Sequence, residues 1–133
     1  MIFVDTSFWV AARVRGERRH AEAVQLLERF DGETFVTSNA VRGETWTFLL
    51  KRAGHRNAVA YLDMLEGSER IRLDRVSEAL EREALAWLRR HDERDYSFVD
   101  ATSFALMRSL RINEALAFDG DFTAAGFVEL RAD

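Results

Sequence analysis

The sequence predicts an α/β fold in which a mainly parallel sheet lies between two layers of helices, a three-layer α/β/α sandwich. Short apolar runs typical of buried strands alternate with longer segments whose apolar residues recur at helical spacing. Such alternation implies crossover connections that place helices on both faces of a parallel sheet. No proline, repeat or low-complexity tract divides the chain, so we expect a single domain over residues 1–133.

Each predicted element has a local signal in the chain. The predicted ranges, in order, are a strand at 2–4, a helix at 19–30, a strand at 34–37, helices at 39–53 and 57–65, a strand at 71–73, helices at 77–91 and 97–110, and strands at 115–118 and 127–130. Ser38 and Ser77 are suitable N-caps, and Gly54 is suited to end the helix before it. Ser97 and Asp100 have the spacing of a capping box.

Composition excludes several kinds of chemistry. The chain has no cysteine, so disulfides, thiolate metal sites and a cysteine nucleophile are excluded. The opening apolar run is too short for a signal peptide and no stretch approaches membrane-spanning length, so we expect a cytoplasmic protein.

Several conspicuous side chains are expected to be structural. The three histidines, His20, His55 and His91, lie beside charged residues without metal-binding spacing, so we expect no catalytic role for them. Six large side chains fall within helical patterns and are expected in the core or at an interface: Trp9, Trp46, Phe48, Tyr61, Met64 and Trp87.

Charge gives two opposed indications about nucleic acid. The net charge of −4 argues mildly against a nucleic-acid substrate, because phosphate binding usually leaves an electropositive surface. A local basic cluster before the first long helix could nevertheless hold an RNA backbone: Arg13, Arg15, Arg18 and Arg19. A solvated charged face is the alternative interpretation of this cluster.

Four acidic residues are predicted to converge on one edge of the sheet. Asp5 follows the first strand and Asp119 follows the strand at 115–118, and ligands bind beyond the C-terminal ends of parallel strands. Glu44 and Asp100 each lie on a mostly apolar face of a helix, so both carboxylates are expected to point inward.

A divalent cation would reconcile four neighbouring carboxylates. At a separation of about 5 Å, each pair repels by roughly 3 kcal/mol at an effective dielectric constant near 20. A set of oxygen ligands favours magnesium or manganese over zinc. Each acid also has an ordinary structural interpretation: Asp100 as a helix cap, Asp119 as part of an Asp-Gly turn, Asp5 as the start of a helix, and Glu44 as the partner of Arg42 or Arg52.

Four segments of the chain resemble PIN domains. They are Ile2–Ser7, Ser38–Glu44, Tyr96–Ala101, and Ala117–Phe122 followed by Ala125–Phe127. Their order and spacing are most similar to those of the VapC-like toxins of type II toxin–antitoxin systems. The resemblance spans nearly the whole chain.

The resemblance implies a metal-dependent endoribonuclease that acts as the toxin of a bacterial toxin–antitoxin pair. It implies that Asp5, Glu44, Asp100 and Asp119 are an acidic quartet that holds Mg²⁺ or Mn²⁺ and hydrolyses RNA phosphodiester bonds to a 5′-phosphate and a 3′-hydroxyl. Ser7 is expected to orient one of these acids through its hydroxyl.

One position departs from the family pattern. Ala117 stands where the family often carries threonine or serine, which leaves open whether Asp119 or Asp121 completes the site. The resemblance further implies a homodimer and a small antitoxin protein that covers the acidic cleft.

Three other functions stay open at this point. A PIN fold could bind a partner through the same acidic pocket without turnover, or could be a housekeeping RNA-processing nuclease. A receiver-like domain or a phosphohydrolase also places acids at strand ends around magnesium. Those last two classes generally use a lysine near the pocket, and the single lysine, Lys51, is not placed for it.

Overall fold

The sheet at the centre of the molecule has five parallel strands in the order β3-β2-β1-β4-β5. The computed structural model describes residues 1–133. Its elements, in chain order, are β1 (Ile2–Val4), α1 (Thr6–Arg13), α2 (His20–Arg29), β2 (Phe35–Ser38), α3 (Asn39–Ala53), α4 (His55–Gly67), β3 (Ile71–Asp74), α5 (Glu78–Arg90), α6 (Phe98–Leu110), β4 (Glu114–Leu116), α7 (Asp121–Ala124) and β5 (Val128–Glu129).

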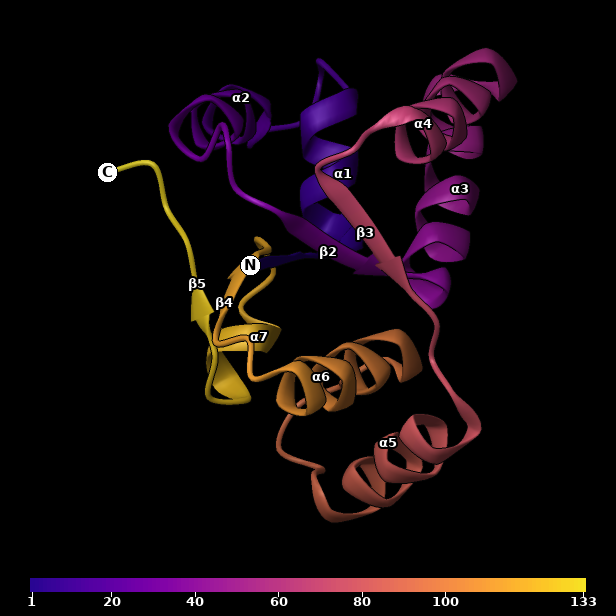
Figure 1. Ribbon diagram of the computed structural model, residues 1–133, viewed down its shortest axis with the longest axis vertical. Helices are drawn as coiled ribbons and strands as arrows, with labels where there is room; N and C mark the ends of the chain where they lie inside the picture. The colour runs from indigo at the N-terminus through magenta and orange to yellow at the C-terminus, as the bar shows by residue number, and fades with distance from the viewer.

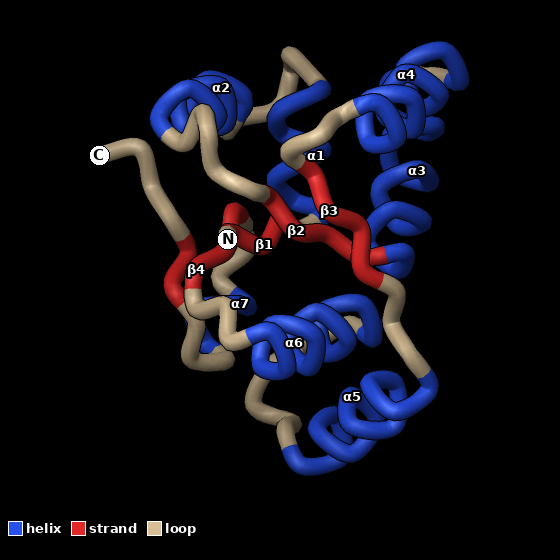
Figure 2. Tube along the Cα trace, viewed as in Figure 1, coloured by secondary structure: helices blue, strands red, loops and turns tan.

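Helices cover both faces of this sheet, which confirms the predicted three-layer α/β/α sandwich. Figure 1 shows α1 to α4 on one face and α5 to α7 on the other, and Figure 2 shows the sheet as the layer between them. No helix combines the length and the apolar character needed to span a membrane.

The strand order creates a switch point between β1 and β4. From β1 the chain proceeds to β2 and β3 on one side, whereas β4 and β5 lie on the other side of β1. The connections that leave β1 and β4 therefore run to opposite faces of the sheet. A crevice opens at such a point, and in open parallel sheets it is the usual ligand site.

The hydrophobic core is continuous across both faces of β1. Ile2, Phe3 and Val4 are each at most 1 % exposed, as expected for a central strand covered on both sides. Below the sheet, the ring of Phe104 on α6 packs against that of Phe122 on α7, with ring centroids 4.9 Å apart. This packing joins α6 to the segment that follows β4.

Two helices, α1 and α7, are missing from the predicted ranges, although the interpretation of Asp5 as the start of a helix is correct for α1. The helix α1 has eight residues, little more than two turns, so its period is hard to recognise in the sequence. The single turn of α7 is too short to show any period. At the end of the chain, β4 stops at Leu116 and β5 covers only Val128–Glu129, so both strands are shorter than predicted.

Candidate active site

A cleft of about 540 Å³ opens at the C-terminal edge of the sheet, beside the switch point. Asp5, Glu44, Asp100 and Asp119 all line this cleft, together with Asp121. The structure thus brings the four predicted acids to one cavity, although they come from four separate parts of the chain.

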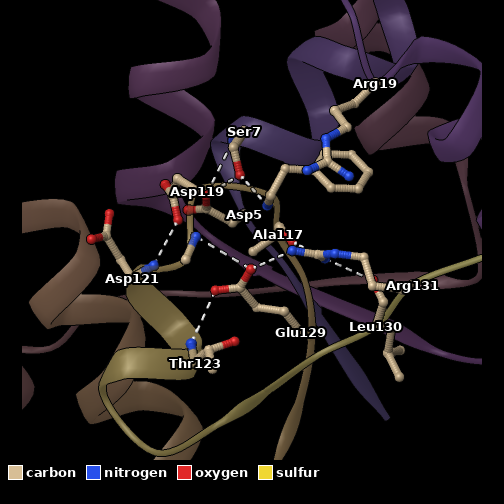
Figure 3. Close-up of polar contacts among 12 residues, drawn as sticks. Asp5, Ser7, Arg19, Ala117, Asp119, Asp121, Thr123, Glu129, Leu130 and Arg131 are labelled. Carbon is tan, nitrogen blue, oxygen red and sulfur yellow. Dashed lines mark hydrogen bonds and ion pairs between the residues drawn. The ribbon is translucent and has the colours of Figure 1, made fainter.

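Asp5 lies directly after β1 and is only 2 % exposed. Its Oδ2 accepts hydrogen bonds from the backbone N–H of Ser7 at 3.1 Å and from the Ser7 hydroxyl at 2.7 Å, so Asp5 also caps α1. The Ser7 Oγ accepts a hydrogen bond from the backbone N–H of Phe118 at 3.0 Å (Figure 3). One hydroxyl therefore connects the residues that follow β1 with those that follow β4.

Asp100 lies in the first turn of α6 and is 7 % exposed. It forms the predicted capping box: its Oδ2 accepts from the Ser97 backbone N–H at 3.0 Å, and its own N–H donates to the Ser97 Oγ at 2.9 Å. The capping interpretation is therefore correct. It engages Oδ2 only, so the same carboxylate can also serve the cleft.

Asp119 and Asp121 lie on the tight turn that leaves β4. Gly120 between them has φ of 84°, a left-handed conformation that favours glycine, and the Asp121 N–H donates to the Asp119 Oδ1 at 3.2 Å. One carboxylate oxygen from each of Asp100, Asp119 and Asp121 lies within 4.8 Å of the other two. The turn therefore brings both candidates for the last acid into the cluster.

Asp121 also has a cationic neighbour. The Nε of Arg94 donates to Asp121 Oδ1 at 2.9 Å, and Arg94 Nη2 lies 3.4 Å from the Asp119 carbonyl oxygen. Arg94 belongs to the connection between α5 and α6, 27 residues earlier in the chain. No sequence pattern links the two residues, and the pair was not predicted.

Burial and mutual repulsion raise the pKa values of three of these acids, so that they hold their protons to higher pH. Burial raises the pKa of Asp5 to about 8, and the charge of Asp119 adds to the effect. Loss of hydration and the neighbouring charges of Asp119 and Asp121 raise the pKa of Asp100 to about 7. For Asp119, loss of hydration in the cleft and the charge of Asp121 raise the pKa to about 6. The acids would lose these protons more readily beside a cation.

Glu44 lines the cleft from α3 but is not one of the three clustered acids. It forms no ion pair with Arg42 or Arg52, because Arg52 pairs with Glu17 instead. The salt-bridge interpretation of Glu44 is therefore wrong. The half-buried carboxylate is free to act in the cleft.

Only part of the predicted basic cluster reaches the cleft. Arg18 and Arg19 line it, whereas Arg13 and Arg15 do not. Arg19 pairs with Glu22 at 2.8 Å and its guanidinium lies 5.4 Å from the centre of the Phe118 ring.

A further arginine and an aromatic ring extend this basic surface. Arg52 lines the cleft, and its guanidinium lies 5.2 Å from the centre of the Phe48 ring. Phe48 is 40 % exposed and lines the cleft too, so of the two places expected for it, the core and an interface, the core is wrong. Lys51 does not line the cleft, so the lysine typical of receiver-like sites is missing.

Two charged residues near the C-terminus support the turn after β4 and were missed from the sequence. The carboxylate of Glu129 accepts hydrogen bonds from backbone amides of that turn, and Arg131 pairs with Glu129 (Figure 3). Glu129 is a charged residue inside an apolar terminal segment, and that contrast is the one local signal that could have identified it.

Comparison with known proteins agrees with this architecture. The family model for the PIN domain matches residues 2–128. The 23S rRNA-specific endonuclease VapC20 of Mycobacterium tuberculosis, in strains CDC 1551 / Oshkosh and ATCC 25618 / H37Rv, is 54% identical over 133 residues, which are 100% of each chain.

Solved structures extend the comparison to the fold. The crystal structure of VapC20 from Mycobacterium tuberculosis, described as a sarcin-ricin loop cleaving toxin, has a TM-score of 0.92 and 54% identity, over 98% of this chain and 99% of that one. The structure of FitAcB from Neisseria gonorrhoeae has a TM-score of 0.68 over 99% of this chain and 98% of that chain, and its 16% identity shows a shared fold alone. The match over residues 2–128, with acids gathered at the switch point, shows that the chain belongs to the PIN domain family.

Proposed function

We propose that this protein is an endoribonuclease toxin that cleaves 23S rRNA at the sarcin-ricin loop, by metal-dependent hydrolysis in the cleft between β1 and β4. The observation that carries the proposal is the cluster of Asp100, Asp119 and Asp121, each with a carboxylate oxygen within 4.8 Å of the others. Full-length identity of 54% to a 23S rRNA-specific endonuclease supports the choice of substrate.

The residues of the cleft suit a hard divalent cation. Asp5, Asp100, Asp119 and Asp121 offer only oxygen ligands, which Mg²⁺ and Mn²⁺ prefer. The raised pKa values of three of these acids indicate that their charge is not offset by the protein alone. We propose that these carboxylates hold Mg²⁺ or Mn²⁺, which when bound would activate water and offset charge on the phosphoryl oxygens.

The other residues of the cleft would orient the reacting groups. The Ser7 hydroxyl holds the carboxylate of Asp5 in place. Glu44 faces the same cavity from α3 without an ion-pair partner, so it is the best placed acid to accept a proton from the attacking water. Arg18, Arg19 and Arg52 would bind the RNA backbone beside the acids, which accounts for RNA binding by a chain of net charge −4.

The proposed partners follow from the same cleft. A small antitoxin protein would inhibit the enzyme by covering the acids, and a basic side chain on that antitoxin would complement their charge. We also propose a homodimer, as in the VapC-like toxins that the chain resembles. Light scattering coupled to gel filtration measures this: a mass near 15.3 kDa would contradict the dimer.

Cleavage of a sarcin-ricin loop RNA by purified, antitoxin-free protein tests the proposal. We expect cutting with Mn²⁺ or Mg²⁺, none with chelator, and at least about a 100-fold loss in Asp100→Asn. Asp63→Asn is a matched control, because Asp63 is an exposed acid on α4 that does not line the cleft.

The same assay separates the other functions. Mn²⁺ binding without cleavage of this RNA, of whole ribosomes or of tRNA would favour a non-catalytic binding domain. Cleavage of precursor RNA with the sarcin-ricin loop left intact would favour a housekeeping RNA-processing nuclease. Activity that survives in Asp100→Asn would show that a contaminating ribonuclease is responsible.

A further inference from the structure

Behind the acidic turn lies an ion pair that does not line the cleft and whose carboxylate is buried. The side chain of Glu129, the last residue of β5, is 2 % exposed, and its Oε1 accepts a hydrogen bond from Arg131 Nη2 at 2.8 Å. A buried carboxylate is retained only where enough partners compensate its lost hydration. The partners of this one are parts of the turn that carries Asp119 and Asp121.

The Glu129 carboxylate contacts both sides of Asp121. Its Oε1 accepts from the Gly120 N–H at 3.3 Å, and its Oε2 accepts from the Thr123 N–H at 3.0 Å. Figure 3 shows these bonds converging on one carboxylate below the turn. Because the two amides bracket Asp121, they restrict the backbone from which its side chain enters the cleft.

Arg131 contacts the other end of the same segment. Its Nη1 donates to the Ala117 carbonyl oxygen at 2.9 Å, and its guanidinium lies 5.4 Å from the centre of the Phe118 ring. The Phe118 N–H in turn donates to the Ser7 hydroxyl, which holds Asp5. Contacts therefore run without interruption from Glu129 to the acid that follows β1.

Without such support, repulsion would move the turn. Asp119 and Asp121 lie close to each other and to Asp100, and like charges at this separation push their backbones apart. Ala117 has no hydroxyl with which to support the turn from its own side chain. Arg94 contacts the turn from the connection between α5 and α6, and the backbone amides of the turn are held by an ion pair that follows in β5 and beyond it.

We propose that Glu129 and Arg131 are positioning residues that hold the segment 117–123 so that Asp119 and Asp121 meet Asp100 around a divalent cation. This inference rests on the proposed metal-dependent function. Neither residue would touch the cation or the RNA. Replacement of such supporting residues typically weakens metal binding by 10- to 100-fold.

The test compares Glu129→Gln with the natural protein, using Mn²⁺ as the probe and calorimetry below the melting temperature as the readout. Glutamine keeps the shape of the side chain but loses the ion pair and one acceptor, so we expect the Kd for Mn²⁺ to rise about tenfold. Arg131→Lys keeps the charge but cannot reproduce the fork that reaches both Glu129 and Ala117, and we expect a rise of about threefold.

Arg29→Gln is the matched control. Arg29 donates to the carbonyl oxygens of Arg131 and Ala132, so it anchors the same C-terminal tail without contacting the turn after β4. We expect its Kd for Mn²⁺ to stay within about twofold of the natural value, even if its melting temperature falls. This variant separates positioning of the acids from general loosening of the tail.

Amide hydrogen exchange of the metal-free protein gives a readout that does not depend on metal or activity. The Gly120 and Thr123 amides should be protected in the natural protein and should exchange faster in Glu129→Gln. Unprotected amides in the natural protein would overturn the inference. So would an unchanged Kd in Glu129→Gln, or, if that variant does not fold, an unchanged Kd in Arg131→Lys.

Failure of the proposed function would look different. In that case the natural protein itself would bind no Mn²⁺ and cleave no RNA, whatever the state of the two amides. If the natural protein binds and cleaves while Glu129→Gln loses only melting temperature, the ion pair is purely structural and the positioning role is wrong.

Discussion

The two ends of the cleft are built in different ways. The acidic end, formed by Asp5, Asp100, Asp119 and Asp121, rests on the ends of β1 and β4 and on the first turn of α6. The arginine end, formed by Arg18, Arg19 and Arg52, rests on the connection between α1 and α2 and on the last turn of α3.

The two ends differ in burial as well as in the sign of their charge. Asp5 and Asp100 are 2 % and 7 % exposed, so their charges are poorly hydrated and strongly coupled. The side chains of Arg19 and Arg52 are 37 % and 48 % exposed, and their ion pairs with Glu22 and Glu17 are of the surface type that contributes about 0–1 kcal/mol. The acidic end is therefore fixed in place and lowers the stability of the metal-free fold. The arginine end, in contrast, can exchange its carboxylate partners for phosphates.

The largest expected effect comes from replacing either acid of the turn. We expect Asp119→Asn and Asp121→Asn each to lower the rate of RNA cleavage at saturating Mn²⁺ by about 100-fold, because each contributes an oxygen to the cluster. Cleavage kinetics with a sarcin-ricin loop RNA measure this. Full activity in Asp121→Asn would confine the acidic end to Asp119 and assign Asp121 to its pairing with Arg94.

A stability measurement tests how much the buried charge of Asp5 lowers the free energy of unfolding. Asp5 has a pKa near 8 in the folded state against an ordinary 3.8, so the folded protein holds a proton that the unfolded chain releases between these values. Stability of the metal-free protein should therefore fall as pH rises from about 4 to about 8. Asp5→Asn removes this penalty, and we expect it to raise the free energy of unfolding by about 2 kcal/mol at pH 8.

Urea denaturation at several pH values checks that prediction. The difference between Asp5→Asn and the natural protein should shrink towards zero as the pH falls to about 3, where Asp5 is mostly protonated in both states. Saturating Mn²⁺ should reverse the order at pH 8, because only the natural protein gains from the cation. If the difference in unfolding free energy between the two proteins does not change with pH, ionisation of the buried Asp5 does not lower stability.

The affinity for the cation should rise with pH, whereas the stability of the metal-free protein should fall. Metal binding requires ionised carboxylates, and the pKa values of Asp5, Asp100 and Asp119 are raised to about 8, 7 and 6. We expect the Kd for Mn²⁺ to fall about tenfold between pH 6 and pH 8, as measured by calorimetry. A constant Kd across this range would mean that the acids are already ionised at pH 6.

The smallest expected effect is at the arginine end. Arg18 lines the cleft and has no carboxylate partner. We expect Arg18→Gln to raise KM for RNA about threefold with kcat unchanged. The slope of log KM against log salt concentration should fall by about one. Arg108→Gln is the control, because Arg108 lies in the last turn of α6 and does not line the cleft. A fall in kcat in Arg18→Gln would move this residue from substrate binding to the chemistry.

Much of the fold was predictable because it depends on local patterns. Helix caps at Ser38, Ser77 and Ser97 each form with a side-chain hydrogen bond, as their residue types indicate. The acids at strand ends were predictable as well, since a parallel sheet brings those ends to one edge. The helix α1 was given no range because its eight residues make little more than two turns, too few to show a helical period clearly, although Asp5 had been considered as the start of a helix.

By itself, the sequence determined the layered architecture, the four acids that line the cleft and the likeness to PIN domains. Tertiary structure alone decided which arginines reach that cleft, that Asp121 joins Asp119 beside Asp100, and that Glu129 and Arg131 support the turn between them. The physical reason is the separation along the chain of the residues in contact. Caps and strand periodicity involve residues within a few positions of each other, whereas these contacts join segments whose proximity exists only once the sheet has formed.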